Sequence, residues 1–206
     1  MNRFFLAFGI LFSVALLAMV FVLVSCTGRL VVEDQPVLLS PINNSSEALG
    51  LGSLFRAPAP AYSNGYHKGI DISFTAEASV VAAATGEVVE VNDSNDSYGP
   101  IKTITVRYND KYQVKYVFEP LLRLSISMGT KLQPGQLIGT LGVREVDGRA
   151  VSWLHFELDE YGQAVCPVQF MSQAARQQFE ELYNLDPTEG LVDPCYEHPT
   201  GCPSLH

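Results

Sequence analysis

Three residues that can bind a metal ion lie in two apolar, strand-like stretches of the chain, "YHKGIDIS" and "SWLHFELDEYG". In the first stretch His67 and Asp71 are four residues apart, so they share a face whether the segment is extended or helical. Gly69 lies between them in the extended case and leaves space for a ligand or a neighbouring backbone. Zinc accepts imidazole nitrogen and carboxylate oxygen, and a catalytic zinc site uses three protein ligands plus an open position. His67, Asp71 and His155 would supply these ligands if the fold brings the two stretches together.

His155 has two notable neighbours on its own face of the predicted strand. Alternate side chains of a strand point to opposite faces, so Trp153, His155 and Glu157 point the same way. Glu157 is a candidate base, although a role in orienting a metal ligand suits it better. Two simpler explanations compete with a metal site. The His67–Asp71 spacing is typical of a surface pair, and a lone histidine in a strand often only packs against its neighbours.

The elements that must position these residues are short β-rich runs separated by turn signals, from about residue 65. "KTITVRYNDKYQVKYVF" predicts a hairpin with Asn109-Asp110 at its turn, and "SVVAAATGEVVEV" predicts two strands around Thr85-Gly86. No helical pattern separates the strands, which predicts a mainly β fold, a twisted antiparallel sheet or open barrel. "SQAARQQFEELYN", behind a capping Ser172, predicts one C-terminal amphipathic helix.

Composition divides the chain into four expected segments. They are a signal peptide or membrane anchor at 1–26, a flexible tether at 27–60, the β domain at 61–170, and a helix with a Cys- and Pro-rich tail at 171–206. The tether is predicted from its polar, turn-rich run "SPINNSSEALGLGS".

The N-terminal segment predicts export. Arg3 precedes an uninterrupted apolar run, and "LVSC" at its end resembles the lipobox of bacterial lipoproteins, in which Cys26 would be acylated. The run is also long enough to span a bilayer as an uncleaved helix. Both alternatives place the domain outside the cytoplasm, anchored to a membrane of the bacterial envelope.

Charge and cysteine content limit which partners and which disulfide bonds the chain can have. The formal net charge is -9 with no run of Lys or Arg, which argues against nucleic acid as a partner. If Cys26 is lipidated, three cysteines remain in a compartment that permits disulfides. Cys195 can pair with Cys202, or Cys166 can pair with either of them, and the sequence leaves the choice open.

The order of motifs resembles the lysostaphin/LytM-type zinc metallopeptidases over about residues 65 to 170. The matching stretches are "HKGIDIS", "VVAAATGEVVEV", "VKYVFEPL", "GTKLQPGQLIGTLG", "WLHFEL" and "AVCPVQF". The resemblance implies a twisted antiparallel sheet that holds one zinc ion and acts on peptide cross-links of the bacterial cell wall. His67, Asp71 and His155 match the family's three zinc ligands.

The departures from the family pattern lie at its catalytic positions. By the resemblance, Phe118 and Trp153 occupy the places of the two catalytic histidines, and Cys166 takes a place usually held by Asp. Phe118 cannot transfer a proton, and the Trp153 indole can only donate a hydrogen bond. Glu119 neighbours one of these places but is expected to point to the other face of a regular strand.

The sequence therefore predicts a zinc-binding, membrane-anchored domain with weak or no peptidase activity. Acid–base groups contribute roughly 100- to 10,000-fold to such reactions, and their loss would leave recognition of peptidoglycan stem peptides or of an envelope protein. Phe118 and Trp153 would then line the old substrate groove or fill the core. The alternatives are an active zinc endopeptidase and a metal-free structural lipoprotein. A biotinyl or lipoyl carrier domain is disfavoured, because none of the lysines of the β region lies in the tight-turn motif that modification needs.

Overall fold

The computed structural model describes residues 35–43, 48–60, 62–96 and 99–185. Within these ranges the chain is mainly β with one α-helix, which confirms the predicted fold class. The N-terminal apolar run with Cys26, and the tail with Cys195 and Cys202, lie outside the described residues. Among the described residues, no helix is both long and apolar enough to cross a bilayer.

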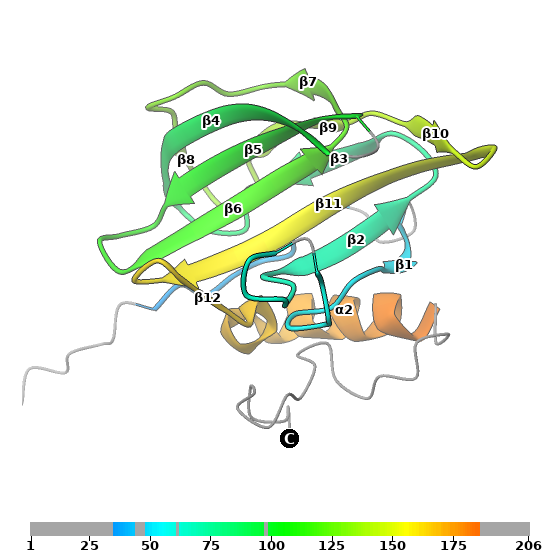
Figure 1. Ribbon diagram of the computed structural model, residues 1–206. Coiled ribbons are helices and arrows are strands. Elements are labelled where there is room, and N and C mark those ends of the chain that lie inside the picture. The colour runs from blue at the N-terminus through cyan, green and yellow to red at the C-terminus, as the bar shows by residue number, and fades with distance from the viewer. Residues whose placement is uncertain (1–34, 44–47, 61, 97–98, 186–206) are drawn as a thin grey trace, which may run out of the picture. The chain divides into compact units, whose positions relative to one another are not determined.

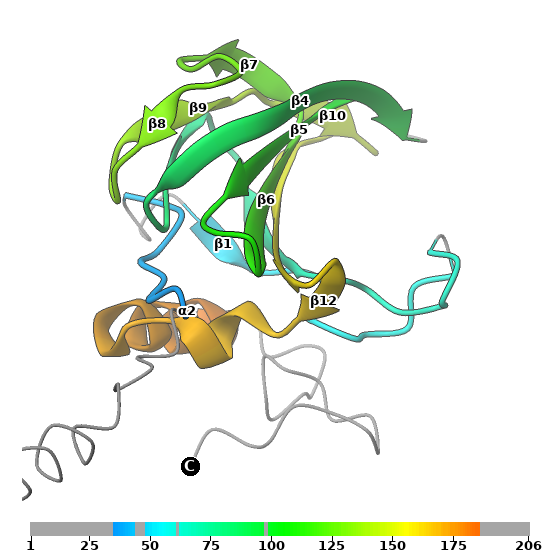
Figure 2. The ribbon, with the colours of Figure 1, turned by 90° about the vertical axis from the view of Figure 1, so that its left-hand side faces the viewer.

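Two antiparallel sheets form the β domain. The large sheet has the order β1-β2-β11-β6-β5-β4-β8, with β10 and β12 paired to β11, and the small sheet has the order β3-β9-β7. Figures 1 and 2 show the large sheet curling towards the small one, so the strands form a half-open barrel. The strands are β1 (Ala48–Leu51), β2 (Ile70–Phe74), β3 (Ala78–Val81), β4 (Gly86–Asp96), β5 (Gly99–Arg107), β6 (Tyr112–Glu119), β7 (Leu121–Leu124), β8 (Lys131–Leu132), β9 (Leu137–Leu141), β10 (Arg144–Val146), β11 (Arg149–Glu160) and β12 (Gln163–Val165).

The hairpin and the helix form where the sequence predicts them. β5 and β6 pair across the expected turn, where the Asn109 side chain accepts hydrogen bonds from the backbone N–H groups of Lys111 and Tyr112. Helix α2 (Gln173–Leu185) follows a 3₁₀ turn at Pro167–Phe170. The Ser172 hydroxyl accepts a hydrogen bond from the N–H of Ala175 and caps α2.

Alternation along β6 sorts its side chains onto two faces. Tyr112, Val114, Tyr116 and Phe118 are buried in the core, whereas the residues between them are partly exposed. The core face of β11 carries Leu154 and Phe156, which lie opposite Phe118 and Tyr116 in the register. The other face of these strands is the one that carries the candidate site.

The prediction of a flexible tether at residues 27–60 is wrong in part. Leu38 and Ile42 are buried, β1 pairs with β2, and Leu54 and Phe55 are each 2% exposed. Helix α2 lies beside β1 in Figure 1, with Ala175, Phe179 and Leu182 in the same core. A few apolar residues in an otherwise polar segment dock it onto the β domain, because burying each apolar side chain stabilises the fold by roughly 1.5–3 kcal/mol.

Candidate metal centre

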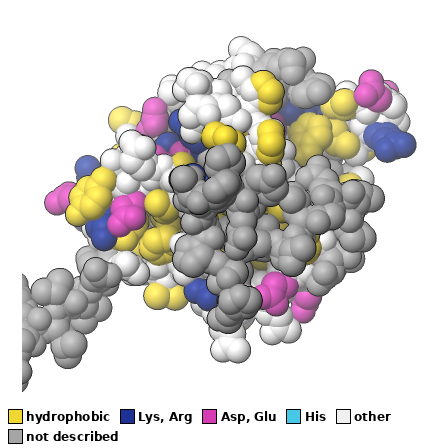
Figure 3. All heavy atoms as spheres, turned by 60° about the horizontal axis from the view of Figure 1, so that its bottom comes forward, with side chains coloured by type: hydrophobic (Ala, Val, Ile, Leu, Met, Phe, Trp, Pro, Cys, Tyr) yellow, Lys and Arg dark blue, Asp and Glu magenta, His cyan; other side chains and the backbone are white. Residues whose placement is uncertain are grey.

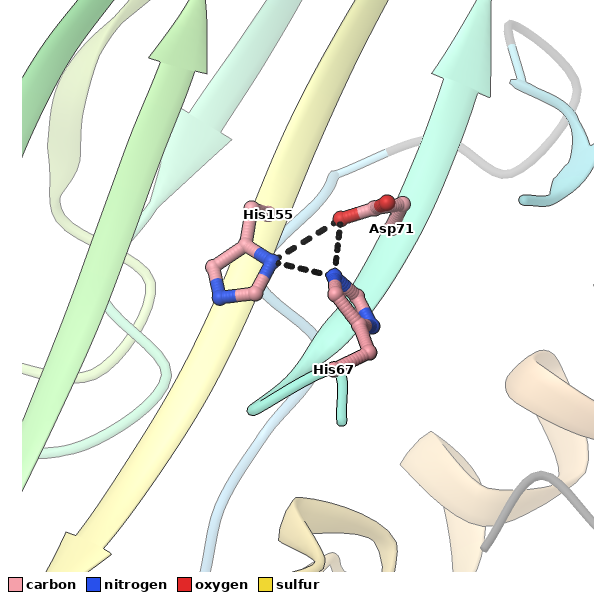
Figure 4. A group of neighbouring side chains, drawn as sticks. All are labelled: His67, Asp71 and His155. Carbon is pink, nitrogen blue, oxygen red and sulfur yellow. Dashed lines mark hydrogen bonds and ion pairs between the residues drawn. The ribbon is translucent and has the colours of Figure 1, made fainter. Parts of the chain in front are cut away.

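Two adjacent strands and the segment before them bring the three predicted ligands together. β2 and β11 are antiparallel, and their register sets Asp71 directly opposite His155. Side chains opposite each other in such a pair share a face, so the carboxylate meets the imidazole. His67 lies just before β2, and Figure 4 shows its ring pointing at the other two side chains. The sequence offered these three residues as ligands on the condition that the two stretches meet, and the family resemblance matched the same three; the structure brings them together.

The distances between the three ligand atoms are short and nearly equal. His155 Nδ1 lies 2.9 Å from both His67 Nε2 and Asp71 Oδ1, and the His67–Asp71 distance is 3.2 Å. Ligands of a tetrahedral zinc ion at about 2.0–2.1 Å lie roughly 3.3 Å from one another. The triangle therefore fits a small divalent cation held by three protein ligands.

The outer nitrogen of each imidazole already has an acceptor. His67 Nδ1 donates to the Leu54 carbonyl oxygen at 3.1 Å, and His155 Nε2 donates to Glu157 Oε2 at 3.3 Å. When both rings are neutral, these bonds select the tautomers in which His67 Nε2 and His155 Nδ1 carry lone pairs. Two nitrogen lone pairs and a carboxylate then face one point, and together they form a donor set for a cation. The outer hydrogen bonds of both rings are those that metal-binding histidines usually make.

Gly69 is required by the same packing. A Cβ at this position would lie 2.4 Å from the Phe156 carbonyl oxygen and 2.9 Å from the His155 ring. The glycine therefore lets the chain after His67 pass close to β11. Of the two uses of this glycine that the sequence suggested, the structure shows the approach of a neighbouring backbone.

The three groups shift one another's pKa in opposite directions. Burial by itself would raise the pKa of Asp71, but hydrogen bonds from His155 and His67 outweigh it and lower the pKa to about 2. Burial would lower the pKa of His155, but hydrogen bonds to Asp71 and Glu157 raise it to about 9. Without a metal, the site therefore keeps a proton on His155 at neutral pH, and a cation must displace this proton.

Sequence reasoning missed the ion cluster behind Glu157. Lys115 Nζ lies 2.7 Å from Glu157 Oε1 and 2.6 Å from Asp159 Oδ2. Burial would raise the pKa of Glu157, but His155 and Lys115 lower it to about 2, whereas burial and Glu157 raise the pKa of Asp159. The only signal in the sequence was the alternation that puts Glu157 and Asp159 on one face. The contact with Lys115 depends on the register of β6 against β11, which the sequence does not show.

The structure corrects the expectation for Phe118. His155 lies opposite Val117, so the odd-numbered residues of β6 share the site's face, and Phe118 points into the core. Phe118 is fully buried, with its ring packed under Gly139 of β9. It does not line the site, and Glu119, expected on the opposite face, lies on the site's face instead.

Trp153 lies on the site's face, as expected, and is partly buried. It lies opposite Glu119 on one side and Ser73 on the other. The Arg144 guanidinium lies 5.0 Å from the centre of its ring, and Arg144 also lies 3.3 Å from a Glu119 carboxylate oxygen. This end of the site is thus an indole, a carboxylate and a guanidinium.

Tyr62 is a further site residue that no sequence pattern indicated. Its ring lies 5.7 Å from the His67 ring and 6.4 Å from the His155 ring, centre to centre. Burial, then the negative charges of Asp71, Glu157 and Glu119, raise its pKa, so the hydroxyl keeps its proton at neutral pH. It can form hydrogen bonds there but cannot serve as a base.

Cys166 is buried and disulfide-bonded. The other cysteines of the chain lie outside the described residues, so the pairing that the sequence left open stays a prediction.

With this geometry established, comparisons with known proteins identify the class. The profile described as "Peptidase family M23" matches residues 65–167, which include all three ligand candidates. The chain belongs to this family, which confirms the predicted LytM/lysostaphin type.

Curated relatives match over the same domain. "Murein hydrolase activator NlpD" of Salmonella typhimurium (strain LT2) is 32% identical over 111 residues, covering 54% of this chain and 28% of that protein. "Outer membrane antigenic lipoprotein B" of Haemophilus influenzae is 30% identical over 108 residues, covering 52% and 25%. The chain thus spans about a quarter of the length of these relatives.

A solved structure supports the fold. A chain of the "SpoIIQ-SpoIIIAH pore forming complex" has a TM-score of 0.50 and 22% identity, and the match covers 68% of this chain and 93% of that one. At this identity the likeness concerns the fold alone.

Proposed function

We propose that this chain is an envelope-anchored M23-family domain that binds one zinc ion through His67, Asp71 and His155 and has weak or no peptidase activity. In this proposal it acts by binding peptidoglycan stem peptides or a wall-hydrolase partner. The observation that carries it is the convergence of three ligand atoms within 3.2 Å of one another, each histidine being held by an outer hydrogen bond. The relatives named as a murein hydrolase activator and as a lipoprotein support a role in the envelope.

The proposed weakness follows from which side chains surround the ligands. A bound zinc ion would polarise a carbonyl group and lower the pKa of water. The chain must still move protons, and within the described residues both histidines are ligands themselves. Glu157 is a poor base because His155 engages one of its oxygens and Lys115 the other. Trp153 and Tyr62 donate hydrogen bonds but do not accept a proton at neutral pH.

Metal analysis and a wall-digestion assay test the proposal together. We expect purified wild type to carry one zinc ion per chain, and His67→Ala to lose it while keeping its fold by circular dichroism. Lys131→Gln, on an exposed strand remote from the site, is the control and should retain zinc. Zinc-loaded wild type should bind purified cell wall but release little soluble peptide.

Two results would contradict the proposal. Robust zinc-dependent digestion that His67→Ala abolishes would identify an active endopeptidase. Absence of zinc from the wild type, with unchanged wall binding in His67→Ala, would identify a metal-free structural lipoprotein.

A hydrolase partner is the second candidate, favoured by the murein hydrolase activator among the relatives. Adding the chain to a wall hydrolase of the same cell should raise the rate of wall digestion although the chain alone gives little. An unchanged hydrolase rate would leave direct peptide binding as the proposed role.

A further inference from the structure

Lys115 is an ammonium on the site's face that the proposed function leaves without a role. The register of β6 against β11 sets it directly opposite Glu157. Its Nζ lies 2.7 Å from Glu157 Oε1 and 2.6 Å from Asp159 Oδ2. Because Lys115 is not a ligand candidate, it can affect the geometry of the metal centre only through one of these carboxylates.

The Glu157 carboxylate is held at both of its oxygens. Oε1 accepts a hydrogen bond from Lys115 Nζ, and Oε2 accepts one from His155 Nε2 at 3.3 Å. The second bond forms whether the His155 ring is doubly protonated or neutral with its proton on Nε2, so it does not depend on the charge of the ring. A carboxylate with a different partner on each oxygen has little freedom to rotate away from either partner.

Without the ammonium, Glu157 would be driven away from His155 and would have the space to move. The side chains of Glu157 and Asp159 are 7% and 8% exposed, and they share Lys115 as counter-ion. Two such carboxylates on one face of β11 repel each other when no cation lies between them. A cavity of about 290 Å³, with all three side chains in its wall, offers room for a rotated Glu157. Loss of Lys115 would therefore weaken the contact that holds the His155 ring.

We infer that Lys115 is a positioning residue of the candidate metal centre, which fixes the Glu157 carboxylate so that this carboxylate orients the His155 ring. The inference rests on the proposed function, because it assumes that a zinc ion binds at His155. Outer partners of metal-binding histidines set the orientation of the ring, and Lys115 acts one contact further out. Its effect on zinc affinity is therefore smaller than that of Glu157.

The charge of Lys115 by itself predicts the opposite effect. An ammonium repels a nearby cation, so removal of this charge alone should strengthen zinc binding. A positioning role predicts weaker binding instead. The two effects are separated by the double variant Lys115→Met with Asp159→Asn, which removes the ammonium but leaves the net charge of Lys115, Glu157 and Asp159 together unchanged.

Zinc titrations of the full chain test the inference with this charge-matched variant. It should bind zinc about three- to tenfold more weakly than wild type, because Glu157 remains but is no longer fixed. Lys115→Arg should bind zinc within about twofold of wild type, since a guanidinium can engage both carboxylates.

Lys102→Met is the matched control on the neighbouring strand β5. Lys102 pairs with Asp93 and lies opposite Phe118, whose side chain faces the core rather than the site. Removal of this ion-paired ammonium should leave zinc affinity unchanged.

The outcomes separate the inference from the proposed function. The Lys115 side chain is 26% exposed, so the charge-matched variant should keep its fold, which circular dichroism checks. If it does not fold, Lys115→Gln with Asp159→Asn keeps polar groups at both positions and should still weaken zinc binding by about twofold or more. Unchanged or tighter binding in the folded variant, or an equal loss in Lys115→Arg, would overturn the inference while zinc binding by the wild type stands. Absence of zinc from the wild type would contradict the proposed function itself.

Discussion

The face of β11 that carries the candidate metal centre has two unlike ends. At one end Trp153, Arg144 and Glu119 form a partly buried cluster, in which the Arg144 guanidinium lies 5.0 Å from the centre of the Trp153 ring and 3.3 Å from a Glu119 carboxylate oxygen. At the other end Glu157 bonds directly to His155 and is itself held by Lys115. The Glu157 end therefore holds a candidate ligand through a direct hydrogen bond, and the Trp153 end is a cluster of an indole, a guanidinium and a carboxylate.

The two ends also differ in how they relate to catalysis. Trp153 is two residues from His155, on the same face, and its replacement of a proton-transferring histidine of the family stays a prediction. The Glu157 end keeps the outer contact that a metal-binding histidine needs. The proposal of a zinc-binding domain with weak or no peptidase activity requires that this outer contact holds a ligand while Trp153 transfers no proton.

The largest expected effect is the difference in zinc affinity between variants of His155 and of Trp153, which lie on the same face of β11. His155→Ala should lower zinc affinity by more than the roughly 10- to 100-fold typical of outer contacts, since it removes one of three ligands. Trp153→Ala should leave zinc affinity within a few-fold of wild type. Titration with a chromogenic chelator measures both. A comparable loss in Trp153→Ala would show that the two ends are not separable.

The pH dependence of zinc binding tests whether the proton on His155 competes with the metal. Because the pKa of His155 in the metal-free site is raised to about 9, apparent affinity should rise by about tenfold per pH unit from pH 7 and level off near pH 9. Competition titrations across this range give the slope.

The proton on His155 also makes the stability of the metal-free chain depend on pH. A pKa raised from 6.5 to about 9 contributes stability that is complete below pH 6.5 and is lost as pH rises through about 9. Chemical denaturation should show this loss, on the order of a few kcal/mol, and zinc should abolish it. A flat profile in both experiments would mean that His155 is neutral in the metal-free site.

The smallest predicted effects compare one residue from each end. Glu157→Gln weakens the acceptor for His155 Nε2 and should lower zinc affinity by about 10- to 100-fold at most. Arg144→Gln, at the Trp153 end, should leave zinc affinity unchanged. Asp159→Asn controls for the charge change, because Asp159 contacts Lys115 rather than a ligand. If Arg144→Gln weakens zinc as much as Glu157→Gln, the distinction between the two ends fails.

The described surface carries charges of both signs. On the face seen in Figure 3, charged side chains of both signs lie scattered among hydrophobic and uncharged ones. That nucleic acid is not a partner was predicted from the formal net charge of -9 and stays a prediction.

Local pattern was a good guide wherever a contact depended on neighbouring residues. The β5–β6 hairpin and the Ser172 cap follow from side chains that bond to backbone within a few positions. The burial of Leu38 and Phe55 was missed, because a few apolar residues in a polar segment give no periodicity and dock only against a surface formed elsewhere.

The sequence by itself determined the β class and offered imidazole and carboxylate groups as candidate ligands, because strand alternation and the preference of zinc for these groups are local properties. Only the tertiary structure decided that Phe118 faces the core, that Glu119 faces the site, and that Lys115 binds Glu157. The physical reason is register: strand side chains alternate with a period of two. A shift of one residue in the pairing of β6 with β11 would therefore exchange the two faces of β6.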